Sequence, residues 1–396
     1  MSGTQRSTFF APCPRGLEGV LRDELIHLHV EDAEPLKGGV RFRGPFDLCY
    51  RANLHSRIAS RVLWAISTRS YRTENDIYTT AAALPWPSWF SVSNRIKVKV
   101  SARQCPLPSL DFVTLRIKDA ICDRFRKTTG SRPNVDTRNP DIGIYAFLDD
   151  RTITFYLDTT GEPLFKRGLR TTHGPSPLRE NLAAGILRLA GWTPGHVLLD
   201  PMCGSGTFLL EAAQIAGNIA PGLNRRFAFE KFSHFDHARW AQLCHKSMTT
   251  QRSIPPQTLF GFDLDERAIN AAKTNVEAAG FADTVTLERK DILDVQPPHP
   301  HGVLVTNPPY GVRSGTDEKL AEWYPQLGDA LKRRFAGWRA FFFTADLRLP
   351  KLIRLSTARR TPLFNGALEC RLFEYPIVRG SHRAKPAIAP PDPTPV

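Results

Sequence analysis

The stretch Val197–Ala213, VLLDPMCGSGTFLLEAA, is the strongest indication of fold in this 396-residue chain. It reads as a strand that ends at Asp200, a glycine-rich turn that contains Gly204 and Gly206, and the start of a helix. A strand, a tight turn and a helix in this order bind nucleotide-like ligands at the carboxyl end of a parallel strand. Glycine lets the backbone approach such a ligand closely. The stretch therefore predicts an α/β domain with a ligand site at one edge of its sheet.

The spacing of the glycines narrows the class of ligand. In the dinucleotide fingerprint a third glycine would stand at position 209, which is Leu209 in this chain. NAD is therefore the less favoured ligand. An aspartate followed by a short glycine-rich turn suits a ligand with a charged amino-acid end, and we predict S-adenosylmethionine.

Three further predicted strands end in polar residues. The strand 258–262 is followed by Asp263, the strand 285–289 by Lys290-Asp291-Ile292, and the strand 302–306 by Asn307-Pro308-Pro309-Tyr310-Gly311. A carboxylate at the end of the second strand is placed to accept hydrogen bonds from ribose hydroxyls. The alternative is that Asp263 caps the next helix, a role that Asp265 could fill instead. The Asn-Pro-Pro-Tyr motif lies where active sites of α/β proteins form.

The segment Gly217–Gln257 separates the glycine-rich turn from the strand before Asp263 by more than the usual distance. It contains possible metal ligands, which are His234, Asp236, His237, Cys244 and His245. Their spacing matches no common zinc pattern, and the periodicity of the segment favours a surface helix. We therefore expect no metal.

The last part of the chain continues the alternation of strands and helices and then ends in a predicted β-hairpin. A helix is predicted over 320–335 and a strand over 340–344. The pair Asn365-Gly366, flanked by two β-patterned runs, is a strong hairpin signal. The sheet is thus expected to be mostly parallel with an antiparallel edge. The proline-rich residues 381–396 are predicted to be a disordered tail.

The first 170 residues have a different pattern. Residues 7–43 read as strand, helix and hairpin, and a second helical stretch is predicted over 46–64. Mixed α and β segments follow to residue 170. This part contains 26 Lys or Arg and 18 Asp or Glu, and the whole chain has a net charge of +14. Arginine binds phosphate with two hydrogen bonds and stacks on bases, so this part could bind RNA. The alternative is that the charge only keeps the protein soluble, and charge density alone does not separate the two.

The composition indicates the cellular compartment in which the protein is expected. Seven cysteines without a C-x-x-C pair are typical of reduced cytosolic thiols. The sequence has no apolar run of membrane-spanning length and no signal-peptide core at its start. We therefore expect a cytoplasmic protein without membrane contact. A monomer is expected, although the sequence does not determine the oligomeric state.

The motifs together resemble a known family. DPMCGSGT (200–207), GFD (261–263), KDI (290–292) and NPPYG (307–311) are similar to class I S-adenosylmethionine-dependent methyltransferases that act on exocyclic amines. FFAPCPRGLEGVLRDEL (9–25), RPNVDTRNPDIGIYAFL (132–148) and LDTTGEPLFKRGLR (157–170) resemble a ferredoxin-like domain followed by a THUMP RNA-binding domain. Over residues 9–378 the chain resembles the amino-terminal half of the RlmL family of ribosomal RNA guanine-N2 methyltransferases. The guanine-N7 activity of the long fused form is not expected.

The resemblance implies an architecture. It places a ferredoxin-like domain at 1–65, a THUMP domain at 66–165 and a Rossmann-like methyltransferase domain with a mostly parallel seven-stranded sheet at 166–380. It implies that the cofactor S-adenosylmethionine is bound by Asp200, Pro201, Met202, Cys203, Gly204, Gly206, Thr207, Asp263, Asp291 and Ile292. It makes Asn307 and Pro308 the pair that orients the amine and Tyr310 the residue that stacks on the base.

The implied function is methyl transfer to the N2 amine of a guanine in 23S ribosomal RNA. Transfer RNA is the alternative substrate, because THUMP methyltransferases of similar layout modify it. A second alternative is a ribosome-assembly factor that binds RNA without catalysis, which the intact Asn-Pro-Pro-Tyr motif and glycine-rich turn disfavour. Cys203 is interpreted as a small packing residue and not as a nucleophile.

Overall fold

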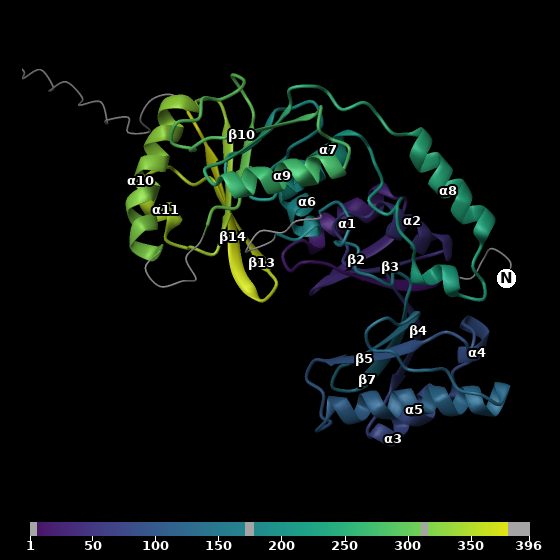
Figure 1. Cartoon of the computed structure of the whole chain (residues 1–396). Coiled ribbons are helices and arrows are strands. Elements are labelled where there is room, and N and C mark those ends of the chain that lie inside the picture. Colours follow the sequence, from purple (N-terminus) through teal and green to yellow (C-terminus); the bar gives the residue numbers. More distant parts are fainter. Residues whose placement is uncertain (1–5, 171–177, 310–315, 379–396) are drawn as a thin grey trace, which may run out of the picture.

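The computed structural model describes residues 6–170, 178–309 and 316–378, with the side chains of 316–318 left out. Within these residues the chain forms two sheets of seven strands each, joined side by side through a shared interface (Figure 1). The prediction of α+β domains followed by a Rossmann-like domain is confirmed. The division of the chain at 65/66 and at 165/166 stays a prediction.

The amino-terminal sheet has the order β2-β3-β1-β4-β7-β6-β5. Its strands are β1 (Ser7–Pro12), β2 (Asp32–Leu36), β3 (Gly39–Gly44), β4 (Leu63–Ser70), β5 (Ile96–Ala102), β6 (Ile142–Leu148) and β7 (Thr152–Asp158). The helices of this half are α1 (Glu18–His27), α2 (Asp47–His55), α3 (Glu74–Ala83), α4 (Trp86–Trp89) and α5 (Leu110–Thr129). They bury one face of the sheet, where Phe9, Phe42 and Phe155 are fully buried.

The central strand β4 corrects one prediction. The second helix was expected over 46–64, but α2 ends at His55, and Leu63 and Trp64 belong to β4. Trp64 pairs with Phe9 of β1 on one side and with Leu157 of β7 on the other. Hydrogen bonding on both sides outweighs the local helical pattern. Because β4 pairs with both neighbours, the ferredoxin-like and THUMP strands form one continuous sheet.

The carboxyl-terminal sheet has the order β10-β9-β8-β11-β12-β14-β13. Its strands are β8 (Leu198–Asp200), β9 (Leu259–Asp263), β10 (Val285–Arg289), β11 (Val303–Thr306), β12 (Arg339–Thr344), β13 (Arg359–Asn365) and β14 (Leu368–Pro376). Its helices are α6 (Glu180–Leu189), α7 (Thr207–Ala216), α9 (Glu266–Ala278), α10 (Thr316–Arg334) and α11 (Leu349–Leu352). The first five strands of the order are parallel, and the hairpin β13–β14 is antiparallel, as predicted.

The segment Gly217–Gln257 connects the carboxyl-terminal half of the chain, which holds the second sheet, to the amino-terminal half through several contacts. It contains the 3-10 helix η1 (Ala228–Lys231) and α8 (His237–Thr249), and α8 packs beside α2 (Figure 1). The Phe229 ring lies 4.6 Å from the Tyr50 ring, and Arg239 donates to Asp47 at 2.8 Å. The Phe229 backbone N–H donates to the Thr159 carbonyl. The segment is therefore an interdomain clamp, which its sequence alone does not reveal.

A buried ion cluster lies at the same junction. Glu211 of α7 is fully buried and accepts hydrogen bonds from Arg167 Nε at 2.5 Å and Nη2 at 3.2 Å. Arg57, which follows α2, lies 3.7 Å from the same carboxylate. Removing such charges from water is unfavourable unless they are paired, so the cluster holds three distant segments in one arrangement.

The described residues include no helix that is both long and apolar enough to cross a bilayer. Among them there is also no group of three or more His, Cys, Asp or Glu side chains placed to hold a metal ion.

Candidate functional site

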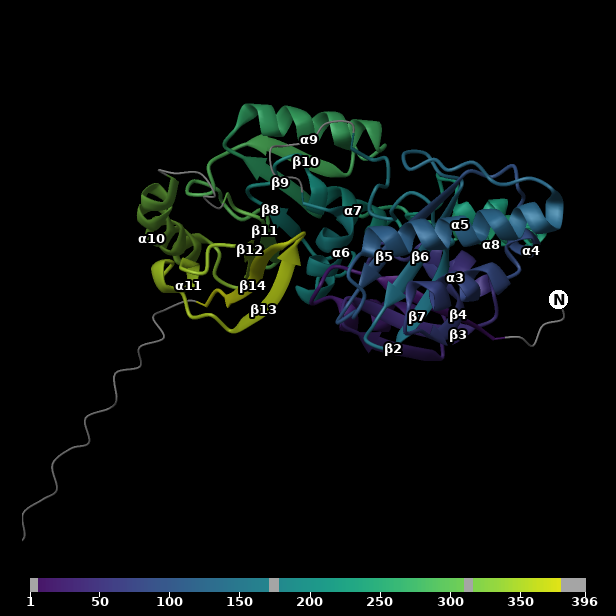
Figure 2. The ribbon, with the colours of Figure 1, turned by 90° about the horizontal axis from the view of Figure 1, so that it is seen from below.

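The polar residues predicted to form the site follow neighbouring parallel strands. Strands β10, β9, β8 and β11 lie side by side and run in the same direction, so their carboxyl ends meet at one edge of the sheet (Figure 2). The chain builds outward from β8 to β10 and then crosses to β11 on the other side of β8. This reversal between β8 and β11 is the topological switch point at which α/β folds bind ligands.

Asp200 ends β8 and is 2% exposed. Its Oδ1 accepts a hydrogen bond from Thr306 Oγ1 at 2.8 Å and one from the Met202 backbone N–H at 3.3 Å. Burial raises the pKa of Asp200 to about 7; the charge of Asp263 adds to this, whereas the two hydrogen bonds oppose it. Asp200 thus joins the glycine-rich turn to the end of β11.

The glycine-rich turn is held by backbone hydrogen bonds to β9. The Cys203 N–H donates to the Phe262 carbonyl at 2.8 Å, and the Gly204 N–H donates to Asp263 Oδ2 at 2.9 Å. Gly204 has φ +54 and Gly206 has φ +83, values in the left-handed region that favours glycine. Both glycines therefore adopt backbone conformations that other residues disfavour.

Asp263 and Asp265 have separate roles in the structure. The Asp265 carboxylate caps α9 by accepting a hydrogen bond from the Arg267 backbone N–H. The capping role that was the alternative for Asp263 therefore belongs to Asp265. Asp263 accepts from Gly204 and from the Asp265 N–H at 3.0 Å. Its carboxylate is therefore fixed beside the glycine-rich turn.

Thr207 begins α7, and its hydroxyl is already engaged. Arg170 Nη1 donates to Thr207 Oγ1 at 2.9 Å, and Arg170 Nη2 lies 2.9 Å from Glu180 Oε1. Burial raises the pKa of Glu180, and the Arg170 charge opposes this effect. The arginine that follows the THUMP strands thereby holds the first turn of α7.

Asp291 and Ile292 follow β10 after one intervening residue, Lys290. Asp291 Oδ1 accepts from the Leu293 backbone N–H at 2.9 Å, and Ile292 is 3% exposed in the second core of the domain. Both residues are therefore held in fixed positions at the same edge as Asp263.

The residues after β11 carry an unusual feature. The Asn307 side-chain oxygen is buried and has no hydrogen-bond partner among the described residues. Pro308 is buried and Pro309 is exposed, whereas Tyr310 lies outside the described residues. Leaving a buried acceptor unpaired is unfavourable by about 1–3 kcal/mol, so this oxygen would gain free energy by accepting a hydrogen bond from a bound group.

The site fits the predicted cofactor in two respects. A Cβ on Gly204 would meet no atom within 4 Å, so open space lies in front of the turn. A Cβ on Gly261 of β9 would lie 2.3 Å from Leu209 Cδ1, so the turn and α7 are packed tightly onto β9. The backbone thus forms a rigid support with room for a ligand beside Asp263.

Cys203 and Pro201 lie within the turn. Burial raises the pKa of the Cys203 thiol well above its usual range, with Asp200 and Asp263 contributing. A thiol of this kind is not a nucleophile at neutral pH. Pro201 is buried between Asp200 and Met202.

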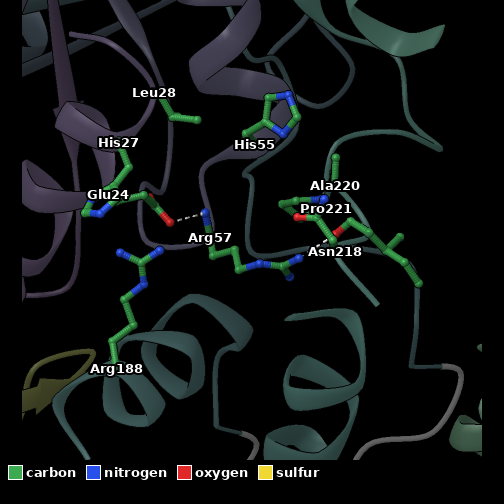
Figure 3. Close-up of a pocket in the computed structure, with 10 residues that line it drawn as sticks. Glu24, His27, Leu28, His55, Arg57, Arg188, Asn218, Ala220 and Pro221 are labelled. Carbon is green, nitrogen blue, oxygen red and sulfur yellow. Dashed lines mark hydrogen bonds between the residues drawn. The ribbon is translucent and has the colours of Figure 1, made fainter. Parts of the chain in front are cut away.

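A separate pocket lies at the junction of the two halves (Figure 3). It has a volume of ≈ 160 Å³, and its charged or titratable lining residues are Glu24, His27, His55, Arg57 and Arg188. Glu24 is satisfied internally, because its carboxylate accepts from Ser56 Oγ and from the Arg57 N–H. Burial lowers the pKa of His55 to about 4, with Arg57 contributing. None of the predicted site residues lines this pocket.

Sequence reasoning missed three residues that support the site. Thr306 and Arg170 donate to Asp200 and Thr207, and Asn275 Nδ2 of α9 donates to the Ser205 carbonyl at 3.1 Å. Only Thr306 carries a local signal, namely a hydroxyl at the end of an otherwise apolar strand. Arg170 and Asn275 are brought to the site by tertiary packing.

Comparison with known families divides the chain into three matched parts. Residues 167–374 match the RMKL-like methyltransferase domain, 71–158 the THUMP domain and 8–63 the RlmL ferredoxin-like domain. The family resemblance predicted from the motifs is therefore confirmed.

Individual relatives and structures agree with these families. The putative RNA methyltransferase slr0064 of Synechocystis sp. is 39% identical over 368 residues, which cover 93% of this chain and 96% of the relative. The ribosomal RNA large subunit methyltransferase K/L of Allochromatium vinosum is 38% identical over 378 residues, which cover 93% of this chain and 51% of the relative. The chain thus spans about half the length of the latter.

Among solved structures, SMU.472, a putative methyltransferase complexed with SAH, aligns with a TM-score of 0.87 at 29% identity. The alignment covers 96% of this chain and 100% of that one. The match of the family model over residues 167–374, together with the Synechocystis relative that is covered over 96% of its length, shows that the chain belongs to the RMKL-like methyltransferase family and carries a THUMP domain.

Proposed function

We propose that this protein transfers a methyl group from S-adenosylmethionine to the exocyclic N2 amine of a guanine in large-subunit ribosomal RNA. The observation that carries the proposal is the buried, unpartnered oxygen of Asn307. It lies next to Thr306, whose hydroxyl is bonded to Asp200 at the switch point. An acceptor without a partner at this position suits a substrate that brings N–H donors.

The cofactor would be held by the edge of the sheet that carries the glycine-rich turn. Asp200, Gly204 and Gly206 would contact its methionine end, Asp263 its ribose, and Asp291 with Ile292 its adenine. S-adenosylmethionine supplies an electrophilic methyl group when it is bound. The SAH in the similar structure SMU.472 supports this assignment.

The chemistry explains why an acceptor is needed. The exocyclic amine of guanine is a poor nucleophile, because its lone pair is delocalised into the ring. Asn307 Oδ1 and the Pro308 carbonyl would accept its two N–H bonds and turn the lone pair out of conjugation. The same two acceptors would stabilise the positive charge that develops on nitrogen during transfer.

No strong general base is required from the chain, because the attacking nitrogen becomes acidic as it forms its new bond. Its proton can then leave to solvent. The buried, protonated thiol of Cys203 takes no part in this scheme, which agrees with a non-covalent transfer. Tyr310 would stack on a base taken out of its helix.

RNA is the substrate class supported by the THUMP match and by the names of the relatives. The charge of +14 favours association with a polyanion. Among RNAs, the relatives named for the ribosomal large subunit favour ribosomal RNA. With this substrate, we propose that the protein acts in the cytoplasm. We also propose that the protein is a monomer and that it uses no metal ion.

The test is methyl transfer by the purified protein to deproteinised ribosomal RNA and, in parallel, to transfer RNA. We expect N2-methylguanosine in the large-subunit ribosomal RNA alone, and loss of the product with Asn307→Ala. N2-methylguanosine in transfer RNA alone would show that transfer RNA is the substrate, and the proposed methyl-transfer chemistry would remain valid. Methylated adenine would contradict the assignment of the amine, and binding of RNA without any transfer would favour an assembly factor.

A further inference from the structure

The amino-terminal sheet has two unlike faces. Helices pack on the face that carries Phe9, Phe42 and Phe155, all of which are fully buried. Figure 1 shows α3 and α5 on the side of β5 and β7 that points away from β2 and β3. Side chains alternate between the two faces of a strand, so the neighbours of the buried residues form a second face.

The strand register places aromatic side chains in a row across this second face. Phe10 of β1 and Tyr156 of β7 have ring centroids 6.4 Å apart, across the intervening β4. Tyr156 is directly opposite Tyr145 of β6. All three rings are half-buried and face the same side of the sheet. Phe147 follows two residues after Tyr145 and is 39% exposed.

Cations border the aromatic row. Lys99 of β5 is paired with Tyr145, and Lys97 is paired with Gly143. Lys97 donates to the Thr137 carbonyl, and within the described part of the chain neither lysine is ion-paired with a carboxylate. At the other end of the row, Arg41 is paired with Glu34. The free positive charge therefore lies along β5, beside Tyr145 and Phe147.

We propose that this face, formed by Phe10, Tyr145, Phe147 and Tyr156 with Lys97 and Lys99, binds a single-stranded segment of RNA. Bases would stack on the rings, and phosphates would reach the two lysines. Aromatic platforms bordered by cations bind single strands, because every base offers a π-face and every linkage a charge. In a duplex the base faces are stacked on one another and cannot reach such a platform.

The proposal rests on the proposed function only in taking RNA as the partner. It adds the place and the form of the RNA, namely a single strand on the second face of the sheet and away from the strand-end site. Stacking explains an exposed phenylalanine on a sheet, and it requires no sequence preference. The target guanine and the platform would thus contact different parts of one RNA.

The test uses the full-length protein and a single-stranded RNA of mixed sequence, about 10 nucleotides long, since such platforms cover ~4–16 nucleotides. Phe147→Ala should weaken binding by about tenfold or more, as measured by fluorescence anisotropy. Phe147→Tyr should restore it, because tyrosine keeps the ring. Lys99→Ala should reduce the dependence of affinity on salt by about one released ion.

The matched control is Phe112→Ala. Phe112 is 50% exposed on α5, on the helix-covered side of the same sheet, and its loss should leave affinity unchanged. Binding to a duplex of the same sequence should not depend on Phe147. Thermal unfolding of each variant reports whether its fold is intact.

The outcomes separate this proposal from the proposed function. If wild-type protein binds the single strand through Phe147 but methylates no RNA, the platform stands and the activity is wrong. If Phe147→Ala and Lys99→Ala bind the single strand as tightly as wild type does, the platform is wrong, whatever the activity. Equal weakening by Phe112→Ala and Phe147→Ala would also overturn it.

Discussion

Thr306 Oγ1 donates a hydrogen bond to Asp200 Oδ1 at 2.8 Å, and it thereby joins the ends of β11 and β8. Asp200 Oδ1 also accepts a hydrogen bond from the Met202 backbone N–H in the glycine-rich turn. Asn307 follows directly, with its side-chain oxygen buried and unpartnered within the described residues. One buried carboxylate thus fixes the predicted cofactor turn relative to the residue predicted to hold the amine.

Asp200 should make stability depend on pH. Its pKa is about 7 in the folded chain and about 4 when unfolded. Between these values the folded state holds a proton that the unfolded state releases, so the contribution of Asp200 to stability is fully present below about pH 4 and is lost as pH rises towards 7. The loss should approach ~1.4 kcal/mol per pH unit. Denaturant unfolding of wild type and Asp200→Asn across this range is the measurement.

The Asp200→Asn variant should lose that slope, because it has no proton to exchange. Asp150→Asn is the control, since Asp150 has a side chain that is 64% exposed. An identical pH slope in wild type and Asp200→Asn would contradict the role of Asp200.

Gly204→Ala should impair binding of S-adenosylmethionine. The new methyl group would enter the open space in front of the turn, where we place the cofactor. Gly280→Ala is a matched control, because Gly280 also has positive φ and open space around its Cβ position but follows α9. Calorimetry should show at least about tenfold weaker binding for Gly204→Ala alone. Equal affinity in both variants would remove the turn from the cofactor site.

Asp263→Ala should weaken cofactor binding through the loss of acceptors for the ribose hydroxyls. The expected change is about 5- to 150-fold, from a lost hydrogen-bond set of about 1–3 kcal/mol. The same titration measures it. Asp265→Ala, which removes the cap of α9 instead, should lower stability and leave the affinity of the folded protein close to wild type. Larger loss of affinity in Asp265→Ala would reverse the roles of the two aspartates.

Asn307→Ala should slow methyl transfer by roughly 10²–10³-fold, because the acceptor acts most strongly on the charge of the transition state. Cofactor affinity should survive, since Asn307 is proposed to face the base. Single-turnover transfer to ribosomal RNA, beside cofactor titration, separates these effects. Asn307→Asp keeps an acceptor and should retain more activity than Asn307→Ala. Near-normal turnover in the alanine variant would disprove the amine-orienting role.

Glu211→Gln should destabilise the junction of the two halves. It leaves the buried guanidinium of Arg167, which is 1% exposed, without its counter-charge. Breaking a buried pair in this way is unfavourable by about 3–5 kcal/mol in the free energy of unfolding. Glu266→Gln removes an exposed partner of Arg289 and should change stability by less than ~1 kcal/mol. Similar small changes in both variants would show that the cluster is not a structural lock.

Most of the elements of the methyltransferase domain, and the sheet edge at which we propose the site, could be predicted from the sequence. Asp200 and Asp263 end β8 and β9, whereas Asp291 and Asn307 follow β10 and β11. The carboxyl ends of neighbouring parallel strands meet at one edge of a sheet, so these residues can be grouped from the sequence alone. The glycines of the turn and the hairpin at Asn365-Gly366 are local features that depend on backbone dihedral angles, so a short window of sequence suffices to predict them.

The other features depend on tertiary packing. The helix expected over 46–64 gave way to β4, because pairing with β1 and β7 depends on strands far away in the chain. Other features also join residues that are separated by tens to hundreds of positions. They are the contacts of segment 217–257 with the amino-terminal half, the hydrogen bond from Arg170 to Thr207 and the buried Glu211 cluster. Local propensity carries no information about such contacts, because their free energy arises only when folding removes both partners from water.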